Sequence, residues 1–515
     1  MWEEMLLNQF HDVLPGSSIR QVYEDTAQIY ERLREKEGNL LSRVEKKLAE
    51  SIGLEENQLA VWNSTGWSRD DILLVPWSER VAKDTQFSQE GQPCIRQETE
   101  EGLLVFVKNI PAYGYTVLTC TSQCAASDDE GHSEHEVCEL CIHDNVMENR
   151  FYRIIFREDG QIDSIYDKEA DREVGCGQPL NVFTAFEDKP QRFDAWDIDI
   201  YYQDKPYPAP RLTKRQVISQ GPVEAVLRQT FAFGSSVIRQ DVAIYSDRKR
   251  IDFRTQVDWK EKQVLLRVYF PVDIHASSAT YEIQCGNIER PTHVNTEWDF
   301  AKFEVCAQKW VDLSEEGYGV SLLNDCKYGH DIHGNTIAMT LIKSSVRPDE
   351  TADRCLHEFT YSLYPHTGSV KQCQVQQEAM DLNLPLFSMA PKSPALDDAA
   401  AKAPGRNGEM AGSLLATDSD HIVIDTVKRA EDERAYIVRL YEYKNKKGKV
   451  SLKFSVPVVR VQETNLIERP LKECPVEENG ITFSVTGYEI KTFKVKVTAE
   501  ALDPQPKLPL QNSSV

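Results

Sequence analysis

The amino-acid sequence predicts a mainly β protein with an N-terminal helical piece. The expected order is a partial three-helix bundle, a small β domain, a large antiparallel β-sandwich and a small C-terminal β-sandwich. Three observations lead to this prediction. Apolar residues recur every three or four positions in residues 1–55, whereas alternation with a period of two prevails from residue 58 onward. Polar stretches interrupt the alternating part. With 515 residues the chain is too long for one hydrophobic core, so several domains are expected.

Residues 1–55 are expected to be helical and to form part of the central bundle domain of a larger protein. Pro15 and Gly16 end a first helix, and a long second helix follows, with Gly38 as a candidate break. An apolar stripe on the second helix must pack on further helices. The helical pattern also begins at once, without a cap before Trp2. We therefore interpret the sequence as a fragment of a longer polypeptide. The stripe consists of Ile19, Val22, Tyr23, Ala27, Tyr30, Leu33, Leu40, Leu41, Val44 and Leu48.

Composition shifts divide the rest of the chain into β domains and connectors. The clearest hairpin signal is Asp159-Gly160 between two alternating runs, and no further long helix is expected. The predicted boundaries are 56–124 for the small β domain, 125–137 for an acidic connector, 138–389 for the large β-sandwich, 390–413 for a linker rich in Pro, Ala, Asp and Gly, 414–500 for the C-terminal β-sandwich, and 501–515 for a disordered tail.

The overall composition is that of an ordinary soluble globular protein, with 41% hydrophobic and 27% charged residues. A net charge of −23 argues against nucleic acid and against an anionic membrane surface as partners. No apolar run approaches the roughly 18 residues of a membrane-spanning helix. The 12 cysteines are scattered singly, so we expect reduced thiols and a cytoplasmic location.

The dipeptide His11-Asp12, followed by Pro-Gly-Ser-Ser, lies between the two predicted helices. An imidazole is the commonest metal ligand in proteins, and a carboxylate can accept hydrogen bonds from hydroxyl groups. The alternative is a histidine at a helix end beside a surface acid. From the dipeptide alone, this alternative is the more frequent situation.

Three further polar clusters could bind a ligand. Asp194 and Asp197 lie among aromatic residues in the stretch 193–202, and acids beside aromatics are typical of sugar pockets. The alternative is an exposed loop whose Trp196 fills a core. Arg290 with His293, and Asn324 with Lys327, lie in two other polar-aromatic clusters, for which the alternative is turn chemistry.

A zinc site can also be imagined at His132, His135, Cys138 and Cys141, which are spaced three apart. We do not favour it. Residues three apart at the start of a strand point to opposite faces, and the two histidines lie in the acidic connector.

Several motifs together resemble glycoside hydrolase family 38, the class II α-mannosidases, in its cytosolic or vacuolar branch. The resemblance covers nearly the whole chain in the right order. It rests on residues 8–17 (NQFHDVLPGS), 194–197 (DAWD), 279–284 (ATYEIQ), 290–293 (RPTH), 298–299 (WD), 303–304 (FE), 310–314 (WVDLS) and 322–329 (LLNDCKYG).

The resemblance implies a retaining hydrolysis of terminal α-D-mannose residues in oligosaccharides, with two carboxylates at the cleaved bond. It implies that His11 is one of four ligands of a Zn²⁺ ion, for which another divalent metal such as Co²⁺ could substitute. Asp12 would contact hydroxyls of the mannose, and the large β-sandwich would close one side of the pocket. Homo-oligomers are common in the family, so self-association is compatible with this reading.

The sequence departs from the family pattern in one respect. The family's N-terminal α/β domain, with a His-x-Asp metal motif and the nucleophile, is not found. We therefore expect the C-terminal half of an α-mannosidase, with no catalytic residue of its own and inactive alone. Sugar contacts are also expected, from position in the motifs, at Asp194, Asp197, Arg290, His293, Asn324 and Lys327. The alternative function is that of a non-catalytic carbohydrate-binding β-sandwich protein.

Overall fold

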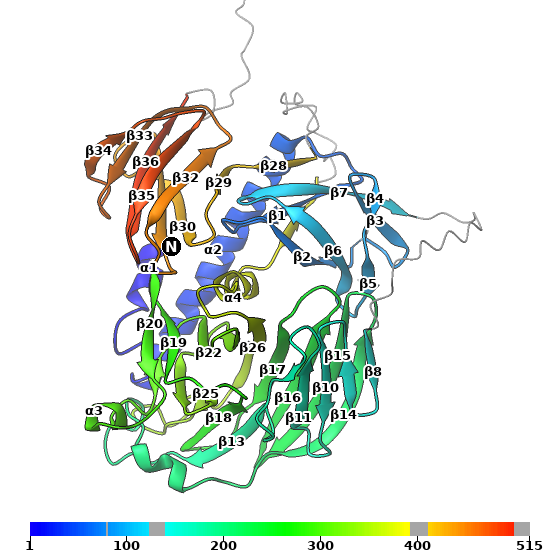
Figure 1. Cartoon of the computed structure of the whole chain (residues 1–515), viewed down its shortest axis with the longest axis vertical. Helices are drawn as coiled ribbons and strands as arrows, with labels where there is room; N and C mark the ends of the chain where they lie inside the picture. Colours follow the sequence, from blue (N-terminus) through cyan, green and yellow to red (C-terminus); the bar gives the residue numbers. More distant parts are fainter. Residues whose placement is uncertain (79–80, 123–139, 392–409, 499–515) are drawn as a thin grey trace, which may run out of the picture. The chain divides into compact units, whose positions relative to one another are not determined.

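The computed structural model describes residues 1–78, 81–122, 140–391 and 410–498 (Figure 1). The chain forms two compact units. The first contains Met1–Ser42 and Ala126–Asn383, and the second contains Arg43–Ala125 and Leu384–Val515. Each unit is therefore built from segments that are far apart in the sequence. Antiparallel β-sheets dominate both units, and the N-terminus is helical, so the predicted fold class is confirmed.

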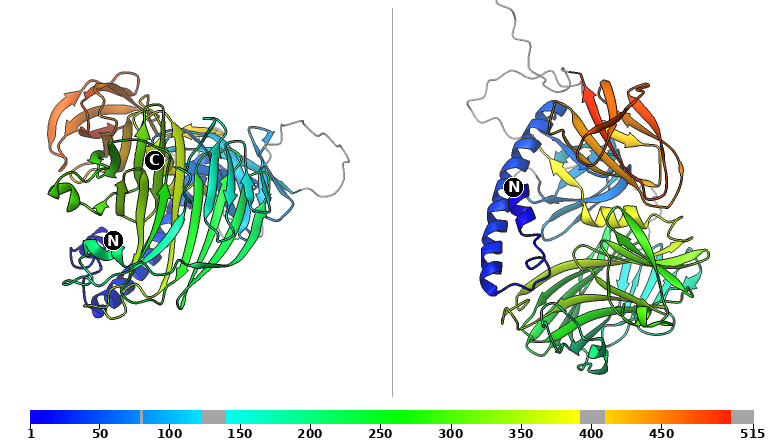
Figure 2. Two further views of the ribbon diagram at one scale, coloured as in Figure 1. Left: turned by 60° about the horizontal axis from the view of Figure 1, so that its bottom comes forward. Right: turned by 90° about the vertical axis from the view of Figure 1, so that its left-hand side faces the viewer.

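The N-terminal segment contains helices α1 (Trp2–Leu7) and α2 (Arg20–Ile52). Figure 2 shows α2 as one continuous helix, so the candidate break at Gly38 is wrong. A glycine inside a helix costs only about 1 kcal/mol, and the remaining turns of this 33-residue helix outweigh that cost. The helix ends instead at Gly53, whose φ of 77° suits the left-handed conformation typical of a residue just after a helix.

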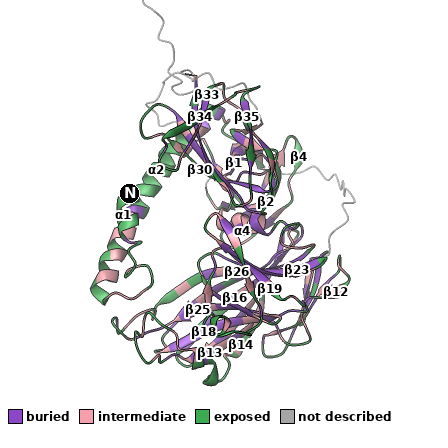
Figure 3. Ribbon diagram, turned by 60° about the vertical axis from the view of Figure 1, so that its left-hand side comes forward, coloured by how far each residue is buried: buried purple, intermediate pink, exposed green. Residues whose placement is uncertain are grey.

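The apolar face of these helices is largely open. Figure 3 shows long exposed stretches on α1 and α2. The large apolar side chains that are exposed along this segment are Trp2, Leu6, Leu7, Phe10, Leu14, Ile19, Leu40, Leu41 and Val44. Several large exposed apolar side chains on one segment are typical of a surface that another protein segment covers.

The large sandwich lies in the first unit and is centred on a nine-stranded antiparallel sheet. In spatial order its strands are β14 (Arg211–Gln220), β15 (Glu224–Phe233), β16 (Ser236–Tyr245), β17 (Ile251–Asp258), β26 (Leu356–Thr367), β23 (Tyr318–Asn324), β22 (Trp310–Glu315), β19 (Ser278–Ile283) and β20 (Gly286–Pro291). All seven residues of β23 are buried, as expected for a central strand covered on both faces.

Two five-stranded sheets complete this unit. One has the order β12 (Arg172–Glu173), β11 (Ile162–Asp167), β10 (Tyr152–Phe156), β9 (Val146–Glu148) and β8 (Cys141–His143). The other has the order β13 (Val182–Glu187), β18 (Val264–Pro271), β25 (Thr336–Lys343), β24 (Gly329–His333) and β21 (Val305–Cys306). The hairpin predicted at Asp159-Gly160 is confirmed, because β10 pairs antiparallel with β11 and Gly160 has a φ of 95°. Side chains from all three sheets form one continuous core.

This unit also has three short helical segments. Two lie between its strands, η1 (Ile200–Asp204) and α3 (Glu297–Phe300), and α4 (Val375–Asn383) follows its last strand, β26. The nine-residue α4 was not expected from the sequence, because its polar residues hide the helical period. Gln376 is nevertheless buried, and its Oε1 accepts a hydrogen bond from Trp310 Nε1 at 2.9 Å. The polar residue thus belongs to the packed face of the helix.

The second unit contains a small β domain and a C-terminal β-sandwich. The small domain has a sheet of β27 (Phe387–Met389), β1 (Gln58–Asn63), β7 (Gly114–Ser122), β3 (Thr85–Gln89) and β4 (Gln92–Pro93), with β28 (Ala411–Ser413) also on β7, and a sheet of β2 (Arg69–Pro76), β6 (Gly102–Ile110) and β5 (Arg96–Glu98). In β2, burial alternates from residue to residue, which is the period of two that the sequence displays.

The C-terminal sandwich packs a three-stranded sheet on a five-stranded sheet around its own apolar core. The first sheet consists of β29 (Leu415–Thr417), β32 (Gly448–Phe454) and β35 (Gly480–Val485). The second consists of β30 (Ile422–Arg429), β31 (Tyr436–Glu442), β36 (Ile490–Val497), β33 (Val458–Thr464) and β34 (Pro470–Cys474). Tyr113 of the small domain donates a hydrogen bond to the Ile424 carbonyl at 2.7 Å, so the two parts of this unit are joined directly. Among the helices of the described residues, none is long and apolar enough to cross a membrane.

Candidate functional site

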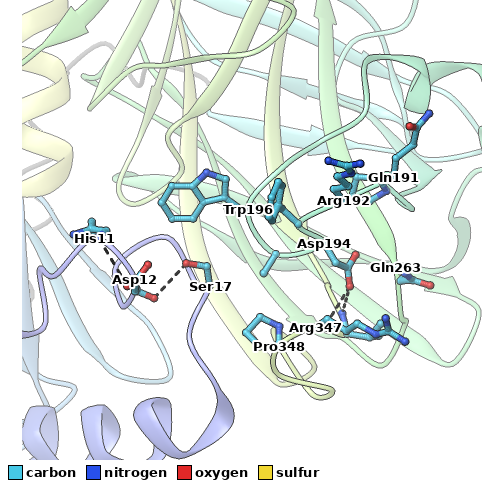
Figure 4. Close-up of a pocket in the computed structure, with 14 residues that line it drawn as sticks. His11, Asp12, Ser17, Gln191, Arg192, Asp194, Trp196, Gln263, Arg347 and Pro348 are labelled. Carbon is cyan, nitrogen blue, oxygen red and sulfur yellow. Dashed lines mark hydrogen bonds and ion pairs between the residues drawn. The ribbon is translucent and has the colours of Figure 1, made fainter.

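The first unit contains an open pocket of about 980 Å³ (Figure 4). The turn between α1 and α2 supplies one part of its lining, and loops of the sandwich supply the rest. Residues almost 340 positions apart in the sequence are thereby brought to one site. The lining residues are His11, Asp12, Ser17, residues 190–196, Gln263 and residues 346–348.

The turn that carries His11 and Asp12 is organised around one backbone carbonyl. The Asp12 carbonyl oxygen accepts hydrogen bonds from the hydroxyls of Ser18 at 2.6 Å, Ser17 at 3.4 Å and Tyr23 at 3.4 Å. Gly16, with a φ of 79°, turns the chain back toward α2. These contacts use the backbone of Asp12 and leave the two side chains pointing outward. His11 is 74% exposed and Asp12 is 56% exposed, with 3.9 Å between Nε2 and Oδ2.

The loop 190–196 is held at its tip by Asp194. One carboxylate oxygen, Oδ2, accepts hydrogen bonds from the backbone N–H groups of Val346 at 2.6 Å and Arg347 at 3.1 Å. The other oxygen, Oδ1, is buried and makes no hydrogen bond in the structure. Asp194 therefore joins the two loops that line the pocket, and it keeps one acceptor unused.

The base of the same two loops is held by a buried ion pair between Asp188 and Lys343. The Asp188 N–H also donates to the Gln263 carbonyl at 2.8 Å. Burial raises the pKa of Asp188, and the nearby acids Asp194 and Asp197 add to this shift, while Lys343 opposes it. The base and the tip of the loop are thus both fixed to the end of β25 and the connection that follows it.

Two exposed aromatic side chains lie on this loop. Phe193 is 71% exposed and Trp196 is 56% exposed. Phe193 has a φ of 55°, a left-handed conformation that is an outlier for a bulky side chain. Strain at an exposed aromatic is characteristic of functional sites rather than of packing. Aromatic rings with nearby acids and guanidinium groups, here Arg192 and Arg347, can stack on a sugar and bind its hydroxyls.

Not all the residues predicted to bind substrate meet at this pocket. His11, Asp12 and Asp194 line it together. Asp197 is nearby in the chain, but its Oδ1 accepts the N–H of Ile198 at 2.9 Å, as in a turn. A sugar contact by Asp197 stays a prediction.

The four remaining predicted residues lie elsewhere in the first unit. Arg290 and His293 line a separate small cavity. Asn324 is fully buried, its side chain donating to the Gln308 carbonyl and accepting the Lys327 N–H, and the Lys327 ammonium lies 4.5 Å from the centroid of the Phe359 ring. The hydrogen bonds of Asn324 and the ring contact of Lys327 are structural. Any contact of these four residues with sugar stays a prediction.

Sequence reasoning missed Arg192, Gln263 and the segment 346–348 as pocket residues. Arg192 could have been found from its position beside the aromatic cluster. Gln263 and residues 346–348 lie in connections that follow β17 and β25, and no local pattern marks them. Their role depends on long-range contacts with Asp188 and Asp194.

The described residues contain no complete metal site. Among them, no group of three or more His, Cys, Asp or Glu side chains converges to hold a metal ion. In the pocket, the imidazole of His11 has one carboxylate near it, that of Asp12 at 3.9 Å. A tightly bound Zn²⁺ takes three or four protein ligands, so the described residues do not fit a complete zinc site. The site considered at His132, His135, Cys138 and Cys141 has its first three residues outside the described part of the chain.

Three family descriptions match the chain. Residues 1–48 match the Alpha mannosidase middle domain. Residues 147–351 match the Glycosyl hydrolases family 38 C-terminal domain, and residues 421–493 match the Glycosyl hydrolases family 38 C-terminal beta sandwich domain. The helical segment and both sandwiches are thus matched in chain order.

Two curated relatives match almost the whole chain. Alpha-mannosidase G of Dictyostelium discoideum is 30% identical over 543 residues, which covers 96% of this chain and 47% of the relative. Alpha-mannosidase 2C1 of Homo sapiens is 32% identical over 487 residues, which covers 91% of this chain and 42% of the relative. The chain spans a little under half the length of these relatives.

A solved structure shares the fold. The crystal structure of an α-mannosidase from Enterococcus faecalis is similar with a TM-score of 0.75 at 16% sequence identity, and the match covers 96% of this chain and 63% of that one. The expected family resemblance is confirmed by these comparisons together with the two family 38 domain matches. The chain contains two domains of glycoside hydrolase family 38, and its relatives from Dictyostelium discoideum and Homo sapiens are α-mannosidases.

Proposed function

We propose that this chain is the part of a retaining α-mannosidase that helps to bind the terminal α-D-mannose residue of an oligosaccharide. The observation that carries the proposal is the pocket in which His11 and Asp12 face a loop bearing Asp194 and Trp196. This is the combination of carboxylates, an aromatic ring and an imidazole that a metal-assisted sugar site requires. The α-mannosidase relatives support the same reaction.

The proposal gives the pocket residues separate roles. His11 supplies one ligand to a divalent metal, Zn²⁺ or in its place Co²⁺, and the remaining ligands come from outside this chain. Asp12 accepts hydrogen bonds from mannose hydroxyls. Trp196 stacks on an apolar sugar face, and Asp194 positions the loop and offers Oδ1 to a hydroxyl. The metal, when bound, polarises sugar oxygens.

The nucleophile and the acid of a retaining glycosidase are two carboxylates about 5 Å apart on either side of the cleaved bond. In the proposal they are not supplied by this chain, which is therefore inactive alone. The open apolar face of α1 and α2 is the surface on which the rest of the enzyme packs. The proposal includes the breakdown of mannose-containing oligosaccharides in the cytoplasm by an enzyme that can form homo-oligomers, without nucleic acid or membrane partners.

The test joins the unmatched part of the Dictyostelium relative ahead of this chain and compares the fusion with the chain alone. Hydrolysis of 4-nitrophenyl α-D-mannoside is measured with added Zn²⁺ or Co²⁺. We expect turnover with retention of configuration in the fusion and none above the blank in the chain alone. A folded but inactive fusion would contradict the proposed reaction. Full activity of the chain alone would contradict the proposal that the nucleophile and the acid come from outside this chain.

A second candidate function is carbohydrate binding without catalysis. It is favoured by the two exposed aromatics of the loop and by the incomplete metal site in the described residues. It predicts saturable binding of glycans to the purified chain on a glycan array, lost in Trp196→Ala, together with an inactive fusion. Binding together with an active fusion supports the enzyme instead.

A further inference from the structure

A second, smaller cavity lies in the first unit, away from the pocket of His11. It has a volume of about 20 Å³ and lies between the β19–β20 hairpin, the loop around α3, and β24. A volume of this size holds about one water-sized group. The cavity lining includes the exposed residues His293 and Lys302. It can thus take one atom of a ligand whose remainder lies at the surface.

The two acids of this cavity already have partners. Asp299 accepts hydrogen bonds from the N–H and the hydroxyl of Thr296, which lower the pKa of Asp299. Asp331 forms an ion pair with the buried Arg267, and His333 Nε2 lies 3.7 Å from its other oxygen. Glu304 also approaches Arg267, at 3.6 Å. The carboxylates of this region are therefore engaged with the scaffold.

Two basic groups of the cavity, those of Arg290 and Lys302, are in the opposite situation. Arg290 lies over the ring of the buried Tyr281, with 5.6 Å from Cζ to the ring centroid. Its Nε is buried and makes no hydrogen bond. Within the described residues, neither the other guanidinium nitrogens of Arg290 nor the ammonium of Lys302 has a hydrogen-bond or ion-pair partner. The ring contact holds the guanidinium plane in place, so little entropy is lost when it binds a ligand.

We propose that this cavity is a binding site for a small oxyanion, a phosphate or phosphoryl group, with Arg290 as the main ligand and Lys302 and His293 at the mouth. One anion oxygen enters the cavity and accepts hydrogen bonds from the terminal nitrogens of Arg290. A planar guanidinium matches the oxygen geometry of such anions. Lys302 contributes a positive charge from the surface. This inference does not depend on the proposed function of the first pocket.

The test is a titration of the purified chain with inorganic phosphate, followed by isothermal calorimetry at constant ionic strength. We expect saturable binding to one site. Affinity should fall about tenfold or more in Arg290→Gln, because a hydrogen bond to a charged group contributes this much. Lys302→Gln, at an exposed position where folding is not at risk, should weaken binding by a smaller factor. Arg211→Gln removes an exposed charge from β14, outside the cavity, and should leave the affinity unchanged.

One further ligand, mannose 6-phosphate, identifies the source of the oxyanion. Mannose 6-phosphate binding more tightly than inorganic phosphate indicates a phosphoryl group on a larger ligand, whereas equal affinities indicate the free anion. Either outcome supports the site. The proposal is overturned by phosphate binding that is not saturable, or by equal phosphate affinity in the wild-type chain, Arg290→Gln and Lys302→Gln.

Discussion

Two histidine–aspartate pairs in the first unit differ in almost every physical respect. His11 and Asp12 are adjacent in sequence, 74% and 56% exposed, and 3.9 Å apart. His366 and Asp312 come from neighbouring parts of the sandwich, are 2% and 1% exposed, and are joined at 2.7 Å. Burial opposes a positive charge on His366, but the hydrogen bond and the charge of Asp312 outweigh it and raise the pKa of His366 to about 10.

The two pairs differ in whether their side chains form hydrogen bonds with the surrounding fold. Ser314 and Ser321 also donate to the Asp312 carboxylate, so both oxygens of this carboxylate accept hydrogen bonds from the surrounding sandwich. The Asp12 turn is held through its backbone carbonyl, which leaves both side chains available. A tight, buried His–Asp pair is therefore a structural feature here, whereas the loose, exposed pair is the one that can bind a ligand.

The largest expected effect is on the buried pair. Asp312→Ala removes the carboxylate that His366, Ser314 and Ser321 contact, so these buried groups lose their acceptor, and the free energy of unfolding should fall by about 3–5 kcal/mol. Asp12→Ala is the matched control and should change it by less than about 0.5 kcal/mol. Urea unfolding of the two variants measures both quantities. Equal effects would remove the distinction between the pairs.

The pH dependence of stability also distinguishes the buried pair from the exposed pair. The folded pKa of His366, about 10, is above the unfolded value of about 6.5. The folded state therefore holds its proton more tightly, and this stabilisation is complete below pH 6.5 and is lost as the pH rises through 10. Between pH 7 and 9 the wild type should lose about 1.4 kcal/mol per pH unit relative to His366→Gln. Parallel pH profiles of the two proteins would contradict this.

The loop that faces the exposed pair should respond to the loss of its anchor. Asp194→Ala removes the acceptor of two backbone N–H groups and should cost about 1–3 kcal/mol. It should also increase the mobility of Trp196, seen as lower fluorescence anisotropy in a variant where other tryptophans are replaced. Asp197→Ala, three residues away, tests whether the loss is specific to the anchor, and we expect little change. An unchanged loop in Asp194→Ala would contradict the positioning role of Asp194.

The smallest expected effect concerns the helix that follows the exposed pair. Gly38 lies inside α2 with open space where a Cβ would be placed. Gly38→Ala should therefore stabilise the helix by up to about 1 kcal/mol, and Gly38→Pro should disrupt it. Circular dichroism at 222 nm during thermal unfolding measures both. A loss of helicity in Gly38→Ala would support the predicted helix break at Gly38.

The sequence predicted what depends on local pattern. The change from a helical to an alternating period placed α2 and the sheets, and the dipeptide His11-Asp12 was recognised because its members are neighbours. The pair of His366 and Asp312 was not recognised, since its members meet only across strands β22, β23 and β26. Residues 346–348 were not recognised either. They are held at the pocket by hydrogen bonds from the N–H groups of Val346 and Arg347 to Asp194, which is distant in the sequence. Asn324 was placed among sugar ligands by its motif, and the structure shows it holding a turn.

The most direct test of this account is the rate of 4-nitrophenyl α-D-mannoside hydrolysis by the fusion protein, compared between His11→Ala and His275→Ala. His275 is an exposed histidine of the same unit and does not line the pocket. The account predicts a loss of roughly 100-fold or more in His11→Ala, because a metal ligand is removed, and an unchanged rate in His275→Ala. Equal rates in the two folded variants would contradict it.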